Sequence, residues 1–161
     1  MARGEAPDEL IALYEQHHAR LVRALSAAGY LDAEDAVQEA FVRAFVHWKK
    51  VSRYDDPAAW VRRVAVNRCL NARRGRNRQA KLADRIAQQP QERSPERDDR
   101  ISERIDALAP QQRTALSLYY LGDCTVRETA DAMGISEGAV KYHLHAARDA
   151  LRGRSMEHDG P

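Results

Sequence analysis

The stretch from Thr125 to Arg152 reads TVRETADAMGISEGAVKYHLHAARDALR and contains two helical patterns separated by a tight turn. Thr125 and Glu128 have the spacing of a capping box that starts the first helix, and Ser136 suits the N-cap of the second. Gly134 suits the turn, because glycine adopts positive φ without a steric penalty. This stretch predicts two short helices joined at an angle, the arrangement of a helix-turn-helix.

Two further residues agree with a helix-turn-helix. Ala130 is small where the helices would cross, and Val140 is apolar where the second helix needs an anchor underneath. The alternative is an ordinary αα-hairpin whose outer face is simply solvated. In the DNA-binding version the second helix enters the major groove and the first lies over the backbone. The candidate DNA contacts are then Arg127, Ser136, Glu137, Gly138, Lys141, Tyr142, His145 and Arg148.

The rest of the chain shows helical periodicity and no convincing strand. Apolar residues recur every three or four positions from Leu10 to Leu25 and again from Ala36 to Trp48. Asp32 with Asp35 resembles a capping box for the second of these helices. Asp56 followed by Pro57 is typical of an N-cap and first helical residue, which predicts a third helix. We therefore expect an all-α fold.

Charge divides the chain into three zones. Residues 1–56 hold seven Lys/Arg and ten Asp/Glu, residues 57–83 hold eight and none, and residues 84–161 hold eleven and fourteen. Residues 84–100 are polar and contain two prolines, which indicates a flexible linker. We expect two small helical domains, residues 1–83 and residues 101–155, joined by the linker 84–100 and followed by a tail, 156–161.

The acid-free zone places its polar side chains along one side of the third helix, opposite Trp60, Val61, Val64 and Ala65. A solvated helix usually mixes Glu with Lys, whereas a one-sign face suits a polyanion. This pattern favours nucleic acid as the ligand. The side chains of the predicted face are Arg62, Arg63, Asn67, Arg68, Asn71 and Arg74.

Several other functions are disfavoured by the composition. Two cysteines and six scattered histidines do not form a metal-ligand pattern, and we expect both thiols to be reduced. No Ser/His/Asp set or glycine-rich phosphate loop stands out, so we expect no enzyme, no cofactor, no metal and no small-molecule substrate. No apolar run is long enough to span a bilayer, which predicts a cytoplasmic protein without membrane insertion.

Three segments together carry a resemblance to a known family. They are DAEDAVQEAFVRAF, PAAWVRRVAVNRCLNARR and LAPQQRTALSLYYLGDCTVRETADAMGISEGAVKYHLHAARDALR. In order and spacing they resemble bacterial RNA polymerase sigma factors of the extracytoplasmic-function group, which keep only the second and fourth conserved regions. The resemblance covers nearly the whole chain and leaves out the first few residues, the linker and the last half-dozen.

The resemblance implies specific partners and roles. The partners would be core RNA polymerase, through its beta-prime clamp helices and beta flap, promoter DNA, and an anti-sigma factor. The residues implied in binding the core are Asp35, Gln38, Glu39 and Arg43. Those implied in recognising and melting the minus-ten element are Arg53, Asp56, Arg62, Arg63, Asn67, Arg68, Asn71 and Arg74. The helix-turn-helix would read the minus-thirty-five element. An acid-bearing surface would thus hold the polymerase while a separate cationic helix holds the parted strands.

Residues 140–148 depart from the family pattern. Family members commonly have V-K-S-R-L-x-R-A-R here, whereas this chain has VKYHLHAAR, so two arginines are missing. The promoter preference therefore does not transfer directly, and fewer phosphate contacts are expected in this half. The string VKYHL also resembles the recognition helix of response-regulator DNA-binding domains. A stand-alone helix-turn-helix transcriptional regulator is the alternative function.

Overall fold

The computed structural model describes residues 6–83 and 107–158, with side chains described as far as Gly153, and in this part of the chain α-helices are joined by turns and short loops. The linker expected at 84–100, the apolar positions Ile101 and Ile105, and residues 159–161 lie outside the described residues. The predicted all-α fold is confirmed. The helices are α1 (Asp8–Ala27), α2 (Ala33–Val46), α3 (Trp48–Val51), α4 (Pro57–Ala83), α6 (Pro110–Tyr120), α7 (Val126–Met133) and α8 (Glu137–His158).

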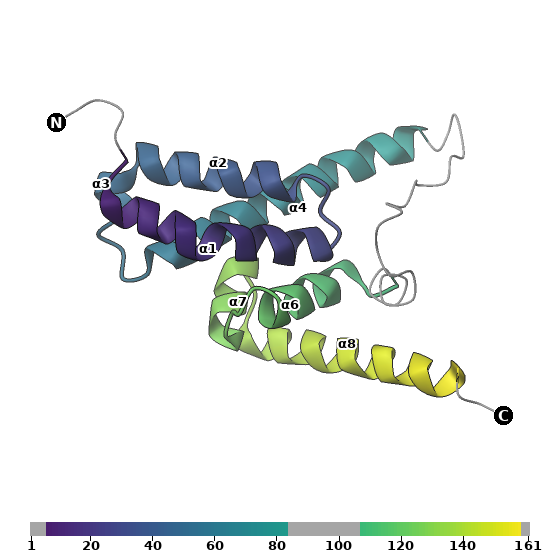
Figure 1. Cartoon of the computed structure of the whole chain (residues 1–161). Helices are drawn as coiled ribbons and strands as arrows, with labels where there is room; N and C mark the ends of the chain where they lie inside the picture. The colour runs from purple at the N-terminus through teal and green to yellow at the C-terminus, as the bar shows by residue number, and fades with distance from the viewer. Residues whose placement is uncertain (1–5, 84–106, 159–161) are drawn as a thin grey trace.

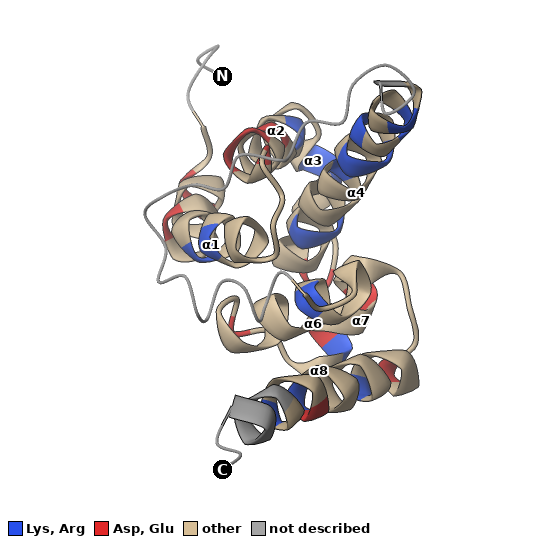
Figure 2. Ribbon diagram, turned by 90° about the vertical axis from the view of Figure 1, so that its right-hand side faces the viewer, with Lys and Arg blue, Asp and Glu red and all other residues tan. Residues whose placement is uncertain are grey.

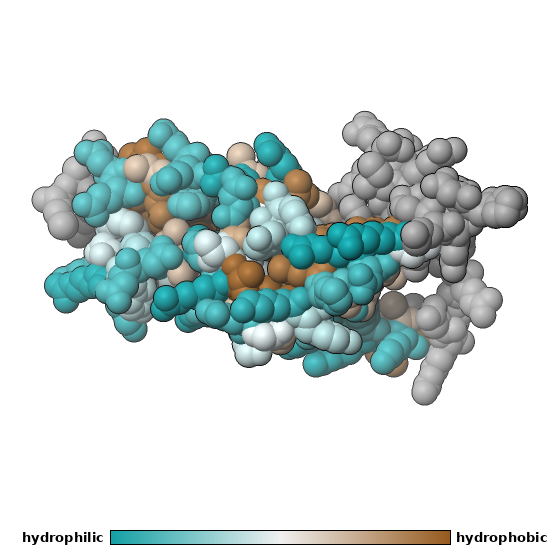
Figure 3. Space-filling model, turned by 90° about the horizontal axis from the view of Figure 1, so that it is seen from below, coloured by the Kyte–Doolittle hydropathy of each residue, from teal (hydrophilic) through white to brown (hydrophobic). Residues whose placement is uncertain are grey.

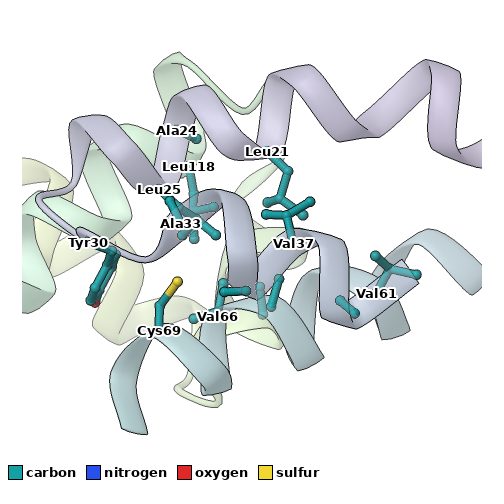
Figure 4. Packing of buried hydrophobic residues seen from close by; sticks show 14 of the residues in the cluster. Leu21, Ala24, Leu25, Tyr30, Ala33, Val37, Val61, Val66, Cys69 and Leu118 are labelled. Carbon is teal, nitrogen blue, oxygen red and sulfur yellow. The ribbon is translucent and has the colours of Figure 1, made fainter. Parts of the chain in front are cut away.

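The first unit is built from α1, α2 and the long helix α4, which packs against both (Figure 1). Leu25, Val37, Val61 and Val66 are at most 1% exposed and form its centre, together with small alanines that let the helices approach closely (Figure 4). Gly29 ends α1 with φ +92°, a conformation that residues with a Cβ rarely adopt.

Helix α2 differs from the sequence-based expectation in two respects. Asp32 is its N-cap residue but makes no capping hydrogen bond, so the predicted capping box is wrong. Its carboxylate instead pairs with Arg76 on α4, an ion pair that competes with the local cap. Phe45, expected in the buried stripe, is 41% exposed, because the core-facing side of α2 is already filled by Phe41 and alanines.

The second unit is built from α6, α7 and α8, and α7 and α8 form the helix-turn-helix. Both hydrogen bonds of the predicted capping box are present: Thr125 N–H donates to Glu128 Oε1 at 2.9 Å, and Glu128 N–H donates to Thr125 Oγ1 at 3.0 Å. Gly134 has φ +68°, and Ala139 N–H donates to Ser136 Oγ at 3.0 Å. The local signals therefore set α7, the turn and the start of α8 as the sequence predicted.

The two units pack against each other rather than lying apart. Leu118, Cys124 and Ala132 of the second unit belong to the same buried cluster as the core of the first. A hydrogen bond of 2.9 Å joins the buried Tyr30 and Thr114 hydroxyls across 84 positions of sequence. Helix α6 contacts α1, and α7 contacts α4 (Figure 1). Burial of apolar surface thus holds the units together.

The Tyr30–Thr114 hydrogen bond allows a direct test of this packing. We expect Thr114→Val to lower the free energy of unfolding by about 1 to 3 kcal/mol, because it leaves the buried Tyr30 hydroxyl unpaired. Tyr30→Phe should lower it less, because Thr114 Oγ1 still donates a hydrogen bond of 2.8 Å to Pro110 O. The double variant should lose less than the sum of the two, with a coupling of about 1 kcal/mol. Urea denaturation of the four proteins measures the cycle. Strict additivity would contradict the packing of the two units in solution.

Candidate nucleic-acid interface

Helix α4 displays a basic face along one side, seen as the row of blue segments in Figure 2. Arg63, Asn67, Arg68, Asn71 and Arg74 are all exposed, and the three- and four-residue spacings 63–67–71–74 and 68–71 align side chains on one side of a helix. The opposite side carries the buried Val61, Ala65, Val66 and Cys69. Five of the six residues predicted for the basic face therefore lie on it.

Arg62 is the exception, and its expected place on the exposed face is wrong. It is only 6% exposed, because α7 covers the first turns of α4. Its guanidinium donates to Glu128 Oε2 at 2.9 Å and approaches Asp56 Oδ2 at 3.4 Å. The neighbouring Arg63 is exposed but pairs with Asp131 of α7. Both arginines thus contact carboxylates of the second unit.

A groove between α2 and α4 brings two predicted sites together. Its volume is about 470 Å³, and its lining includes Asp35 and Arg43 from α2 and Asn67, Arg68 and Asn71 from α4. The acidic edge of α2 therefore lies directly next to the cationic helix α4. The two helices pack side by side, so their polar edges share one groove.

Glu39 forms ion pairs with one arginine on each of the two helices that line this groove. Its carboxylate pairs with Arg68 on α4 and, at 3.2 Å, with Arg43 one turn further along α2. Gln38 and Asp35 are exposed on the same helix. Glu39 therefore also positions Arg68, an arginine of the basic face.

Helix α2 carries an apolar strip on its outer side that was not predicted. Val42 is 51% exposed and Val46 is 67% exposed, and both lie beside Phe45. The signal was present in the sequence: seven of the ten residues from Val37 to Val46 are apolar, more than one buried stripe of an amphipathic helix requires. Such a strip is typical of a protein-contact surface.

A second cleft lies where the loop before α4 faces α7. It has a volume of about 830 Å³ and is lined by Tyr54, Asp56, Trp60, Arg63 and Arg127, among others. Arg53 is exposed in the same loop. Trp60 is partly buried against the core and also lines the cleft, so it belongs to both. Asp56 accepts a hydrogen bond of 3.3 Å from Ala59 N–H, as expected for an N-cap.

The candidate residues of the helix-turn-helix are mostly exposed. Tyr142 is 67% exposed, and His145 lies 3.2 Å from Asp149 in an i,i+4 pair. Arg148 is partly covered: its Nε donates to the Tyr120 hydroxyl at 2.9 Å, and its guanidinium lies over that ring. The other exposed candidates are Arg127, Ser136, Glu137, Gly138 and Lys141. Seen from the side of α8, the surface is mostly hydrophilic around a small apolar area (Figure 3).

Burial sets the chemistry of the two cysteines. It raises the pKa of the Cys69 thiol to about 12 and that of Cys124 to about 11. Both are free, as expected, and both remain unreactive thiols while buried. At the contact between the units, backbone hydrogen bonding to Thr125 lowers the pKa of Glu128, and burial lowers the pKa of His17.

No helix in the described parts of the chain is long and apolar enough to cross a bilayer. Among the same residues, no three His, Cys, Asp or Glu side chains lie close enough together to hold a metal ion.

Comparison with known proteins gives two family matches. The family described as Sigma-70 region 2 matches residues 10–79, and Sigma-70, region 4 matches residues 98–151. The chain is 34% identical over 155 residues to ECF RNA polymerase sigma factor SigL of Mycobacterium tuberculosis, covering 88% of this chain and 85% of SigL. It is 30% identical over 132 residues to the RNA polymerase sigma-E factor of Streptomyces coelicolor, covering 80% and 75%.

Two solved structures share the fold. One is the sigma factor RpoE in complex with the anti-sigma factor NepR from Bartonella quintana, with a TM-score of 0.67, 21% identity and coverage of 90% of this chain and 92% of that chain. The other is CnrH in complex with the cytosolic domain of CnrY, with a TM-score of 0.62, 23% identity and coverage of 94% and 89%. With an all-helical fold, both conserved regions in order and a basic helix beside an acidic one, this chain belongs to the ECF group of the sigma-70 family and is a promoter-directing RNA polymerase sigma factor.

Proposed function

We propose that the outer side of α2 is the surface on which this sigma factor holds core RNA polymerase, through the beta-prime clamp helices. Asp35 and Gln38 are exposed there, next to the apolar strip formed by Val42, Phe45 and Val46. An acidic edge beside apolar side chains suits a partner helix that offers basic and apolar residues. Glu39 and Arg43 complete this surface. The proposed contact of the second unit is the beta flap.

The basic face of α4 is the proposed binding site for the melted minus-ten strand. Arg63, Asn67, Arg68, Asn71 and Arg74 follow one side of the helix and supply donors to phosphates and to unpaired bases. The cleft lined by Asp56 and Trp60 suits a base that has left the stack, and Arg53 is exposed in the adjoining loop. Arg62 joins this set once α7 no longer covers it.

The start of α8 is the proposed reader of the minus-thirty-five element. Glu137 and Lys141 are exposed in its first turns, where a recognition helix meets base edges. Ser136 immediately precedes α8, and Arg127 lies in the first turn of α7. His143 and Ala146 stand where the family commonly has arginine, and Tyr142 and His145 are the neighbouring candidates for base contact. We therefore expect a weaker dependence on salt in this half.

The proposal includes the predicted division of the chain into two domains, a linker and a tail. The domains are residues 1–83 and 101–155, the linker is residues 84–100 and the tail is residues 156–161. An anti-sigma factor is a proposed partner, because one structural relative is a sigma factor in complex with an anti-sigma factor, and the other is in complex with the cytosolic domain of CnrY. We propose that the chain catalyses no covalent step itself. It supplies promoter recognition and strand separation to the polymerase.

The observation that carries the proposal is the ion pair of Glu39 with Arg68, a residue that lines the groove, because this pair joins the polymerase-binding edge to the strand-binding edge. The test is run-off transcription from a set of genomic promoters with purified chain and core polymerase. We expect transcripts that start at defined positions only when both are present. Tight dimeric binding to an intact palindrome, without any response to core polymerase, would instead establish the stand-alone regulator.

A further inference from the structure

Helix α7 places two carboxylates directly on the start of the basic helix α4. Glu128 Oε2 accepts a hydrogen bond of 2.9 Å from Arg62, and Asp131 pairs with Arg63. The Arg62 side chain is 7% exposed, whereas that of Glu128 is 34% exposed. A charge-assisted pair with one partner buried is stronger than a surface pair, because water screens it less.

The pairs lie at the edge of a continuous apolar contact. Cys124 and Ala132 are buried against the first unit, and Met133 packs partly on the same cluster. The contact between α7 and α4 is therefore part of the packed core and is not a contact between two solvated surfaces (Figure 2).

The two arginines held by α7 also belong to the proposed strand-binding set. A guanidinium bonds carboxylate and phosphate oxygens with the same donors, so α7 and a nucleic-acid strand compete for them. Arg127 of α7 lines the same cleft, which places a proposed minus-thirty-five contact beside the minus-ten surface. In this arrangement the proposed minus-ten surface on α4 and the proposed minus-thirty-five surface on α7 cover each other.

One feature of the contact favours its release. The Nε of Arg62 is buried without a hydrogen-bond partner among the described residues. The closed arrangement thus leaves one guanidinium donor unsatisfied, and this donor finds an acceptor when the helix is exposed.

We infer that α7 is an intramolecular competitor for the promoter strand, which keeps the free sigma factor closed and weakly binding until polymerase separates the two units. This rests on the proposed strand-binding role of α4. The apparent dissociation constant for a strand rises in proportion as the open fraction falls. Loosening the contact therefore strengthens binding by the free chain, although no residue that touches DNA has changed.

The experiment uses a double variant, Glu128→Gln with Asp131→Asn, in a Cys69→Ala background that leaves Cys124 as the single thiol. Gln at position 128 keeps the capping box, so α7 still starts at the same place. The control, Glu9→Gln with Glu15→Gln in the same background, removes two carboxylates from exposed positions of α1. Both variants change the net charge equally.

Two readouts follow opening and binding separately. We expect the double variant to react with a thiol reagent at Cys124 about tenfold faster, and to bind a single-stranded DNA oligonucleotide about tenfold more tightly, than the parent chain. The control should change each value by less than about twofold. Unchanged labelling, or a gain in DNA affinity that the control matches, would overturn the competition by α7.

Run-off transcription with excess core polymerase separates this inference from the proposed function. Transcription by the parent chain together with unchanged Cys124 labelling in the variant would refute the competition alone. Absence of promoter-directed transcription by the parent chain, with faster labelling of the variant, would refute the proposed function and leave the closed contact established.

Discussion

We expect the double variant Arg63→Glu with Arg74→Glu to abolish promoter opening while core polymerase still binds. Both side chains are exposed on the basic face of α4, and neither lines the groove that α4 shares with α2. Each reversal turns a donor to phosphate into a repelling charge, so open complexes should fall at least about 100-fold. Permanganate reactivity of unpaired thymines measures the opening, and affinity chromatography on core polymerase measures the binding.

The matched control is Arg63→Lys with Arg74→Lys, which keeps the charge and loses only the planar guanidinium. This variant should retain opening within about tenfold, because phosphate attraction is mainly electrostatic. Equal loss in the Glu and Lys variants would mean that these arginines act through a specific fit to bases. Loss of core binding by the Glu variant would place the polymerase contact on α4.

The second large effect is expected on α2. Asp35→Lys with Glu39→Lys should weaken binding to core polymerase at least about 100-fold, because it reverses the charge of the edge that faces the partner. The same substitutions at Glu9 and Glu15 on α1 change the net charge equally and should leave core binding within about threefold. A competition assay with a labelled sigma factor gives both affinities.

The ion pair between Glu39 and Arg68 requires one more variant. Asp35→Lys alone leaves this pair intact, so it alters the outer edge of α2 without disturbing the basic face. We expect it to lower core affinity and to leave single-strand binding unchanged. An effect on single-strand binding with normal core binding would reverse the assignment of the two helices.

Much of the fold was predictable because its signals are local. Thr125 with Glu128, Gly134 and Ser136 set the ends of α7 and the start of α8 through contacts within a few residues, and all of them are present in the structure. Asp56 and Gly29 did the same for α4 and α1. Interactions that span one turn of chain are encoded by residue type and spacing alone.

The candidate site was only partly predictable. The alignment of Arg63, Arg68 and Arg74 on one face follows from helical periodicity, and the structure shows that face exposed. The predicted capping role of the Asp32 side chain failed because Arg76, 44 positions away, takes its carboxylate. A local signal is overridden when a distant group offers a stronger partner.

Residue type and spacing were enough to predict the all-helical fold, the caps of α4, α7 and α8, and the family to which the chain belongs. Tertiary packing sets which polar residues remain available: Arg62 is buried against Glu128, 66 positions further along, and Glu39 pairs with Arg68. The physical reason is that helix periodicity gives the direction of a side chain but not its neighbour. That neighbour depends on which apolar faces pack together, and here the packing of the two units turned part of the basic face inward.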